Sequence, residues 1–212
     1  MRVDIWSDLV CPWCYLGKRR LELALAAHER AGEVEVLFHS FELDTEAAPS
    51  DHRPMRELIA QKYGLTPGEV ARSQAHLTSL AASAGLEYHL EATRRVNTFD
   101  AHRLLHLARD LAVQGELAEA LFASYFTEGR VIDEHEELVA IAAGAGLGQP
   151  EVRRVLGSDA YAEHVRRDEQ AAVELGASGV PFFVFGGRYP VAGAQPPEVL
   201  AKVLDRVFEE GA

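Results

Sequence analysis

Alternating apolar and polar residues predict strands near the start of the chain. Residues 2–7 (RVDIWS) and 33–39 (EVEVLFH) carry apolar side chains at every second position, which is typical of half-buried strands. Between them, apolar residues recur at helical spacing until Gly32 ends the run. Residues 2–39 therefore predict a β–α–β unit.

The middle of the chain, residues 45–167, has almost no strand pattern and predicts one helix after another. Apolar positions at helical spacing, as in residues 101–112, are repeatedly followed by glycine. Asp133 and Glu136 resemble a capping box at the start of one helix, and Ser158 is placed to cap another. This part predicts a helical subdomain.

Strand patterns return near the C-terminus. Residues 182–185 form a short apolar run, Gly186-Gly187 is typical of a hairpin turn, and residues 188–191 return as a second strand. Apolar residues from Val199 to Phe208 then follow a helical period. We expect a β-hairpin followed by a last amphipathic helix.

The order of these elements predicts an α/β fold with one core. Residues 1–44 and 168–212 form the sheet-containing domain, and residues 45–167 are a helical subdomain inserted into it. The chain has 212 residues, of which 48% are hydrophobic and 25% charged, and this composition is typical of a globular protein.

Charge and hydropathy exclude several kinds of partner. The chain has 21 basic and 33 acidic residues and a net charge of −12, which disfavours nonspecific binding to nucleic acid or anionic lipid. No apolar run is long enough to span a bilayer. The first residues, Met1 to Asp4, lack the apolar segment of a secretory signal. We expect a cytoplasmic protein without nucleic-acid or membrane partners.

The candidate chemistry lies in the only two cysteines, Cys11 and Cys14. A disulfide across this short step constrains the unfolded chain little, so the pair indicates redox or metal chemistry. At a helix start, unpaired N–H groups and the helix dipole favour a thiolate. We assign Cys11 as an exposed nucleophile and Cys14 as the screened, resolving thiol. Pro12 and Trp13 are expected to contact the substrate, with Trp13 exposed.

Zinc binding by the cysteine pair is a second possibility. A structural zinc ion usually has four ligands, and there is no other cysteine in the chain. His102 and His106, one helical turn apart, would have to complete the set. A zinc-binding scaffold without enzymatic activity therefore stays an alternative, although we expect no metal.

Val180 and Pro181 stand directly before the predicted strand at residues 182–185. Proline is tolerated at the start of a strand, and X-Pro bonds are the usual place for cis peptides. A cis bond would turn the backbone of Val180 toward a partner peptide beside Cys11. From the residues alone, an ordinary trans proline is the commoner outcome.

Four motifs together resemble the FrnE-type branch of the DsbA-like thioredoxin-fold oxidoreductases. They are Cys11–Gly17 (CPWCYLG), Asn97–His102 (NTFDAH), Gly179–Phe183 (GVPFF) and Gly193–Gln195 (GAQ). The resemblance implies a thioredoxin fold with a helical insertion, a redox-active cysteine pair and a cis bond before Pro181. It also implies exchange with protein or small-molecule disulfides, no bound cofactor, and substrate contacts from Asn97 and Gln195.

Kappa-class glutathione transferases and 2-hydroxychromene-2-carboxylate isomerases share part of this resemblance. Those relatives typically have Ser at the position of Cys11, and an acidic residue and an Arg in the late motif hold glutathione. This chain has Gln195-Pro196 there. A glutathione-dependent isomerase or transferase is therefore the main alternative, and glutathione as a transient reductant stays open.

Overall fold

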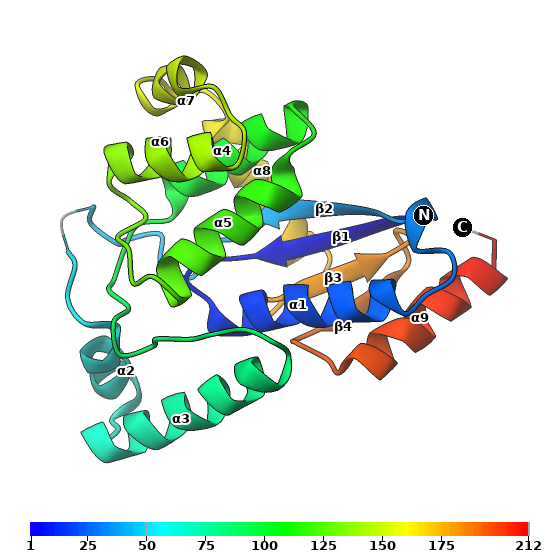
Figure 1. Ribbon diagram of the computed structural model, residues 1–212, viewed down its shortest axis with the longest axis horizontal. Coiled ribbons are helices and arrows are strands. Elements are labelled where there is room, and N and C mark those ends of the chain that lie inside the picture. The colour runs from blue at the N-terminus through cyan, green and yellow to red at the C-terminus, as the bar shows by residue number, and fades with distance from the viewer. Residues whose placement is uncertain (50, 212) are drawn as a thin grey trace.

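The computed structural model describes residues 1–49 and 51–211 and is built on a four-stranded sheet (Figure 1). The strand order is β2–β1–β3–β4, with β1 and β2 parallel and the other two pairs antiparallel. The strands are β1 (Arg2–Ser7), β2 (Glu35–Ser40), β3 (Phe182–Phe185) and β4 (Tyr189–Ala192). The strands lie close to their predicted positions because their apolar residues alternate or form a short buried run.

Helices cover both faces of this sheet. On one face α1 (Pro12–Ala26) and α9 (Pro197–Glu209) lie side by side (Figure 1). On the other face Trp6 packs with Phe182 and Val184 against Ala172 of α8 (Ala162–Glu174). The sheet is thus a buried layer between helices, as expected for an α/β domain.

The chain between β2 and β3 is helical, as its pattern predicts. It contains α2 (Met55–Tyr63), α3 (Pro67–Ser83), α4 (Phe99–Asp110), α5 (Gln114–Phe126), α6 (His135–Gly144), α7 (Gln149–Leu156) and α8; a single 3-10 turn, η1 (Ala31–Glu33), precedes β2. Gln114 clamps this region to β2, because its side chain accepts a hydrogen bond from the Phe38 N–H at 3.0 Å and donates to the Phe38 carbonyl at 2.8 Å. The two regions share one hydrophobic core. The domain boundaries stay a prediction, and α8 lies across the second one.

Two predicted helix caps are wrong. The carboxylate of Asp133 accepts a hydrogen bond from the Asn97 N–H at 3.0 Å and lies 3.0 Å from His52, so it holds a loop instead of capping α6. The Ser158 hydroxyl donates to the carbonyl of Arg154, and α8 begins only at Ala162. The side chains of Asp133 and Ser158 thus make other contacts in place of capping a helix, and the sequence pattern does not reveal these contacts.

Within residues 1–49 and 51–211, no helix has both the length and the apolar character needed to cross a bilayer.

Candidate active site

The cysteine pair lies where β1 turns into α1. Cys11 is the N-cap residue of α1 in extended conformation, and Pro12 occupies the first helical position, where no N–H is needed. The Cys11 N–H donates to the Asp8 carbonyl at 3.1 Å, and the Cys14 N–H donates to the Cys11 carbonyl at 2.9 Å. Both sulfurs are free thiols. The geometry therefore places the first thiol at the positive end of the helix and the second one turn later.

Burial differs from the expectation for Cys11. The sequence predicts an exposed nucleophile, but Cys11 is only 5% exposed, and Cys14 is 1% exposed. Trp13, between them, is 41% exposed, as predicted. Burial raises the pKa of the Cys14 thiol well above its ordinary value, and the neighbouring Cys11 raises that pKa further. Cys14 is therefore a screened thiol that stays protonated as long as Cys11 is not part of a disulfide.

The loop before β3 covers the sulfur of Cys11 from one side. The Val180–Pro181 bond is cis, and the Cys11 thiol donates to the Val180 carbonyl with an Sγ–O distance of 3.7 Å. Gly17 of α1 permits this approach. A Cβ atom at that position would lie 2.9 Å from Cγ of Pro181 and 3.2 Å from Cζ of Phe183. The absence of a side chain at Gly17 lets α1 pack directly on the proline loop.

Aromatic and charged residues of the insert support the other side of α1. Tyr15 stacks on Phe122 with ring centroids 5.0 Å apart, and its hydroxyl donates to Glu119 at 2.8 Å. The buried Lys18 ammonium also pairs with Glu119 and lowers the pKa of that carboxyl against the opposing effect of burial. These contacts fix α1, and with it the cysteine turn, to α5.

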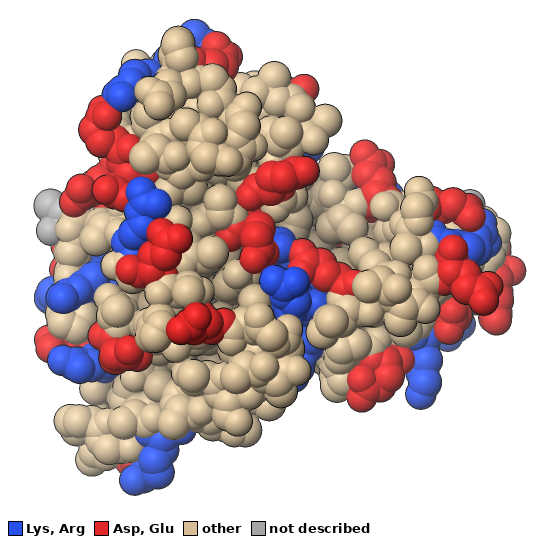
Figure 2. Space-filling model, viewed as in Figure 1, with Lys and Arg blue, Asp and Glu red and all other residues tan. Residues whose placement is uncertain are grey.

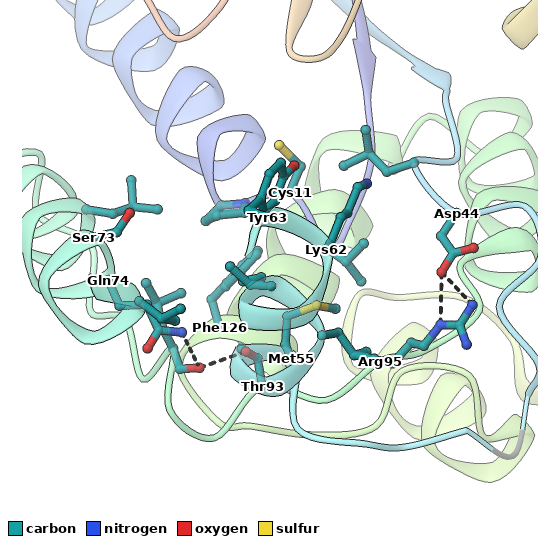
Figure 3. Close-up of a pocket in the computed structure, with 18 of the residues that line it drawn as sticks. Cys11, Asp44, Met55, Lys62, Tyr63, Ser73, Gln74, Thr93, Arg95 and Phe126 are labelled. Atoms are coloured by element: carbon teal, nitrogen blue, oxygen red, sulfur yellow. Dashed lines mark hydrogen bonds and ion pairs between the residues drawn. The ribbon is translucent and has the colours of Figure 1, made fainter. Parts of the chain in front are cut away.

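A cavity of about 770 Å³ opens beside Cys11, between the N-terminal end of α1 and the helices α2 and α3 (Figure 3). Its lining is mostly apolar and includes Cys11, Pro12, Trp13, Ile59, Leu77 and Phe126. This volume lies within the range of about 300–1,000 Å³ that is usual for small-molecule sites. Cys11 is thus buried from the outer surface but lies in the wall of a cavity.

Buried polar side chains lie just before the cysteine turn. Oδ2 of Asp8 accepts a hydrogen bond from the Leu43 N–H at 2.7 Å, and Oδ1 of Asp8 lies 3.5 Å from Nε2 of His102. Asp8 and His102 are each 1% exposed. His106, one turn later on α4, lies 3.2 Å from the Ser40 hydroxyl and 3.2 Å from a carboxylate oxygen of Asp168.

The two histidines considered as zinc ligands therefore face carboxylates. In the part of the chain that the structure describes, no three His, Cys, Asp or Glu side chains are grouped as metal ligands.

The structure does not bring every candidate residue to the cavity. The Asn97 amide donates to the Ala47 carbonyl at 2.8 Å and accepts from the Phe99 N–H at 3.0 Å, which starts α4. The Gln195 amide donates to the Ala192 carbonyl at 2.8 Å. Neither residue lines the cavity, so their substrate contacts stay predictions. Lys62 and Tyr63 do line it, and no sequence motif points to either.

Comparisons with known proteins agree with this arrangement. The family described as DSBA-like thioredoxin domain matches residues 2–205, so the chain belongs to that family and has its thioredoxin fold. A structure of a probable DsbA oxidoreductase from Streptomyces coelicolor is 44% identical, has a TM-score of 0.96, and the match covers 100% of this chain and 92% of that one.

More distant structures share the fold alone. The cytosolic disulfide reductase DsbM from Pseudomonas aeruginosa has a TM-score of 0.70 at 18% identity, with both chains fully covered, and it is also solved with GSH. A 2-hydroxychromene-2-carboxylate isomerase has a TM-score of 0.69 at 18% identity, with 99% and 97% coverage. Among protein sequences, the uncharacterized protein YwbO from Bacillus subtilis is 24% identical over 206 residues, which cover 96% of each chain.

Proposed function

We propose that this chain is a cytoplasmic thiol–disulfide oxidoreductase of the FrnE type that works through Cys11 and Cys14. The observation that carries the proposal is the position of the two thiols. Cys11 lies at the N-cap of α1 in the wall of a cavity, and Cys14 lies behind it, almost fully buried. Membership of the DSBA-like family and the likeness to a probable DsbA oxidoreductase support this function.

The raised pKa of Cys14 determines which of the two thiols reacts first. Cys11 attacks first, because Cys14 is screened and protonated. When Cys11 enters a mixed disulfide, it no longer raises the pKa of Cys14 by charge and hydrogen bonding. Cys14 then ionises more readily and attacks the Cys11 sulfur, which releases the substrate thiol.

Trapping of intermediates tests this scheme. In Cys14→Ser, the attacking thiol remains but the resolving thiol is lost, so mixed disulfides on Cys11 should accumulate and disappear when dithiothreitol is added. Cys11→Ser is the matched control and should trap nothing. Equal trapping by both variants, or by neither, would contradict the assignment of roles.

The glutathione-dependent isomerase alternative has less support. Such chemistry needs only one residue, which activates glutathione, and does not use a second thiol. In this chain, however, Cys14 lies one turn behind Cys11. The Gln195 amide in the late motif is engaged by the Ala192 carbonyl. Glutathione fits the proposal as a transient reductant of the oxidised pair. Elemental analysis of the zinc content distinguishes the oxidoreductase from the remaining alternative, a zinc-binding scaffold without enzymatic activity.

A further inference from the structure

Access to Cys11 restricts what can react with it. The residue is 5% exposed, and its sulfur lies against the Val180 carbonyl on one side. The cavity between α1, α2 and α3 provides open space next to Cys11. A disulfide on the rigid surface of a folded protein cannot easily reach a sulfur in a cavity wall, whereas a small molecule can enter.

The charges around this cavity differ from those of the whole chain. The chain has a net charge of −12, and Figure 2 shows acidic side chains at many places on the viewed face, with basic side chains among them. Among the described residues that line the cavity, Asp44 is the one carboxylate, and Arg53, Lys62 and Arg95 are the cations. The described residues that line the cavity therefore include more cations than carboxylates, although the chain as a whole is acidic.

Lys62 is the cation in this lining that is available to a ligand. Arg53 pairs with Asp51 at 2.7 Å, and Arg95 pairs with Asp44 at 2.7 Å and also with Asp51 (Figure 3 shows the Asp44 pair). Among the described residues, Lys62 has no carboxylate partner, and its ammonium lies 5.7 Å from the centre of the Tyr63 ring. A bound carboxylate could pair with Lys62 without breaking an existing ion pair.

We propose that the substrate of this site is a low-molecular-weight disulfide with an apolar body and a carboxylate group. The apolar lining takes the body, Lys62 holds the carboxylate, and Cys11 in the wall attacks the disulfide. The proposal rests on the proposed function and narrows its substrate class. A cavity of about 770 Å³ suits a molecule of this kind.

The chemistry is a two-electron exchange. The Cys11 thiolate attacks one substrate sulfur, the substrate S–S bond breaks, and the first half leaves as a thiolate that takes up a proton from water. The Cys14 thiol loses its proton to water and attacks the Cys11 sulfur, which forms the Cys11–Cys14 disulfide and releases the second half as a thiolate that takes up a proton from water. The substrate is reduced and the enzyme dithiol is oxidised. One turnover of the reduced protein needs no other reductant.

Single-turnover kinetics can test the proposal with the pre-reduced, intact chain under anaerobic conditions. The probes are 5,5′-dithiobis(2-nitrobenzoate), which is aromatic and anionic, 4,4′-dithiodipyridine, which is aromatic and neutral, and insulin as a protein disulfide. Each rate is divided by the rate of N-acetylcysteine with the same probe, which removes intrinsic reactivity. We expect the normalised rate to be at least about tenfold higher for the anionic probe than for insulin, because only the small molecule enters the cavity.

Lys62→Gln tests the contribution of the Lys62 charge independently of the contribution of the cavity. We expect the rate with the anionic probe to fall about threefold to fivefold, as expected for loss of one partly exposed ion pair, while the rate with the neutral probe stays within about twofold. Lys202→Gln, an exposed lysine on α9, makes the same change in net charge and should leave both rates unchanged. An equal loss in both lysine variants would overturn the role of Lys62.

Ile59→Trp tests the cavity itself. Ile59 is half-buried in the lining, and the larger side chain should slow both small probes. Arg56→Trp places the same side chain on α2 outside the lining and should leave the rate with the neutral probe, which does not depend on the lost charge, unchanged. If insulin reacts as fast as the anionic probe, the substrate class is wrong although the exchange activity stands. If the dithiol reacts with no probe faster than N-acetylcysteine does, the proposed function itself fails.

Discussion

The hydroxyl of Tyr88 donates a 2.7 Å hydrogen bond to the carbonyl oxygen of Pro12, the residue that follows Cys11. Tyr88 lies between α3 and α4 and is 4% exposed, so the insert holds the cysteine turn by a contact across 76 residues. Burial raises the pKa of Tyr88, and the neighbouring Tyr15 and the two cysteines raise it further. The phenol therefore remains a donor throughout the working pH range.

Removal of this hydroxyl should loosen the cysteine turn. In Tyr88→Phe we expect the free energy of unfolding to fall by about 0.5–1.5 kcal/mol, the usual contribution of one hydrogen bond. Urea unfolding of the reduced protein measures the change. Tyr63→Phe is the matched control, because Tyr63 is 64% exposed, and should change stability by less than about 0.5 kcal/mol. Equal losses in the two variants would show that the Pro12 contact contributes nothing.

The two thiols should differ in their reaction with iodoacetamide. We expect Cys11 to be alkylated at least about tenfold faster than Cys14, because burial and the neighbouring Cys11 keep Cys14 protonated. Peptide mass spectrometry after brief labelling measures the ratio. In urea-unfolded protein the preference should disappear. Faster labelling of Cys14 in the folded protein would reverse the proposed roles.

A methyl group at Gly17 should separate α1 from the proline loop. Gly17→Ala places a Cβ 2.9 Å from Pro181 Cγ, and we expect a loss of about 1–3 kcal/mol from overpacking. Exchange should slow as well, since the same loop carries the Val180 carbonyl beside Cys11. Gly115→Ala on α5, where nothing lies within 4 Å, should instead stabilise by about 0.5 kcal/mol. Thermal unfolding of both variants tests the opposite signs.

His39 should make stability depend on pH. Its Nε2 lies 2.7 Å from Asp4 and its Nδ1 lies 3.0 Å from Asp168. Burial alone would lower the pKa of His39, but hydrogen bonds and charge from these two carboxylates outweigh burial and raise it. The stability that this histidine contributes is therefore full below about pH 6.5, its ordinary pKa, and is lost as the pH rises through the folded value.

His39→Gln isolates that contribution. The stability difference between the parent chain and the variant, from urea unfolding at pH 5 to 8.5, should shrink as the pH rises above about 6.5. His106 also faces Asp168, but burial lowers its pKa, so its own contribution to stability has the opposite dependence on pH. His76→Gln, an exposed site on α3, should show no such trend. A difference that is constant with pH would rule out the His39 effect.

The strands and most helices could be predicted because each depends on a local pattern. β1 and β2 follow alternation, the Gly186-Gly187 turn has positive φ at both residues, and α9 follows a helical period. The two wrong caps show the limit of such patterns. Asp133 has the right residue type and spacing, but its carboxylate is engaged by Asn97 and His52 from distant parts of the chain.

The cysteine pair and the Val180-Pro181 segment beside it could be found in the sequence, but the burial of Cys11 and the cavity could not. The motif predicts a thiol at a helix start, and the structure places Cys11 there. The Val180 carbonyl lies beside Cys11, as the sequence predicts. The cavity depends on α2 and α3, which are far from Cys11 in the sequence and carry no motif that points to it. Lys62 and Tyr88 belong to no motif, so only the folded chain shows that they reach the same site.

The outer strand β4, at one of the two edges of the sheet, affects how copies of this chain can associate. A free strand edge offers unpaired N–H and C=O groups to other chains and so promotes aggregation. Gly193 N–H donates to the Pro181 carbonyl at 2.8 Å, and the register pairs Pro190 with Val184. Hydrogen-bonded pairs therefore recur at every second residue from Gly193, and Pro190, between two of them, directs its ring nitrogen to the free edge. That edge lacks a donor where a neighbouring strand would need one, so β4 resists edge-to-edge growth into fibres.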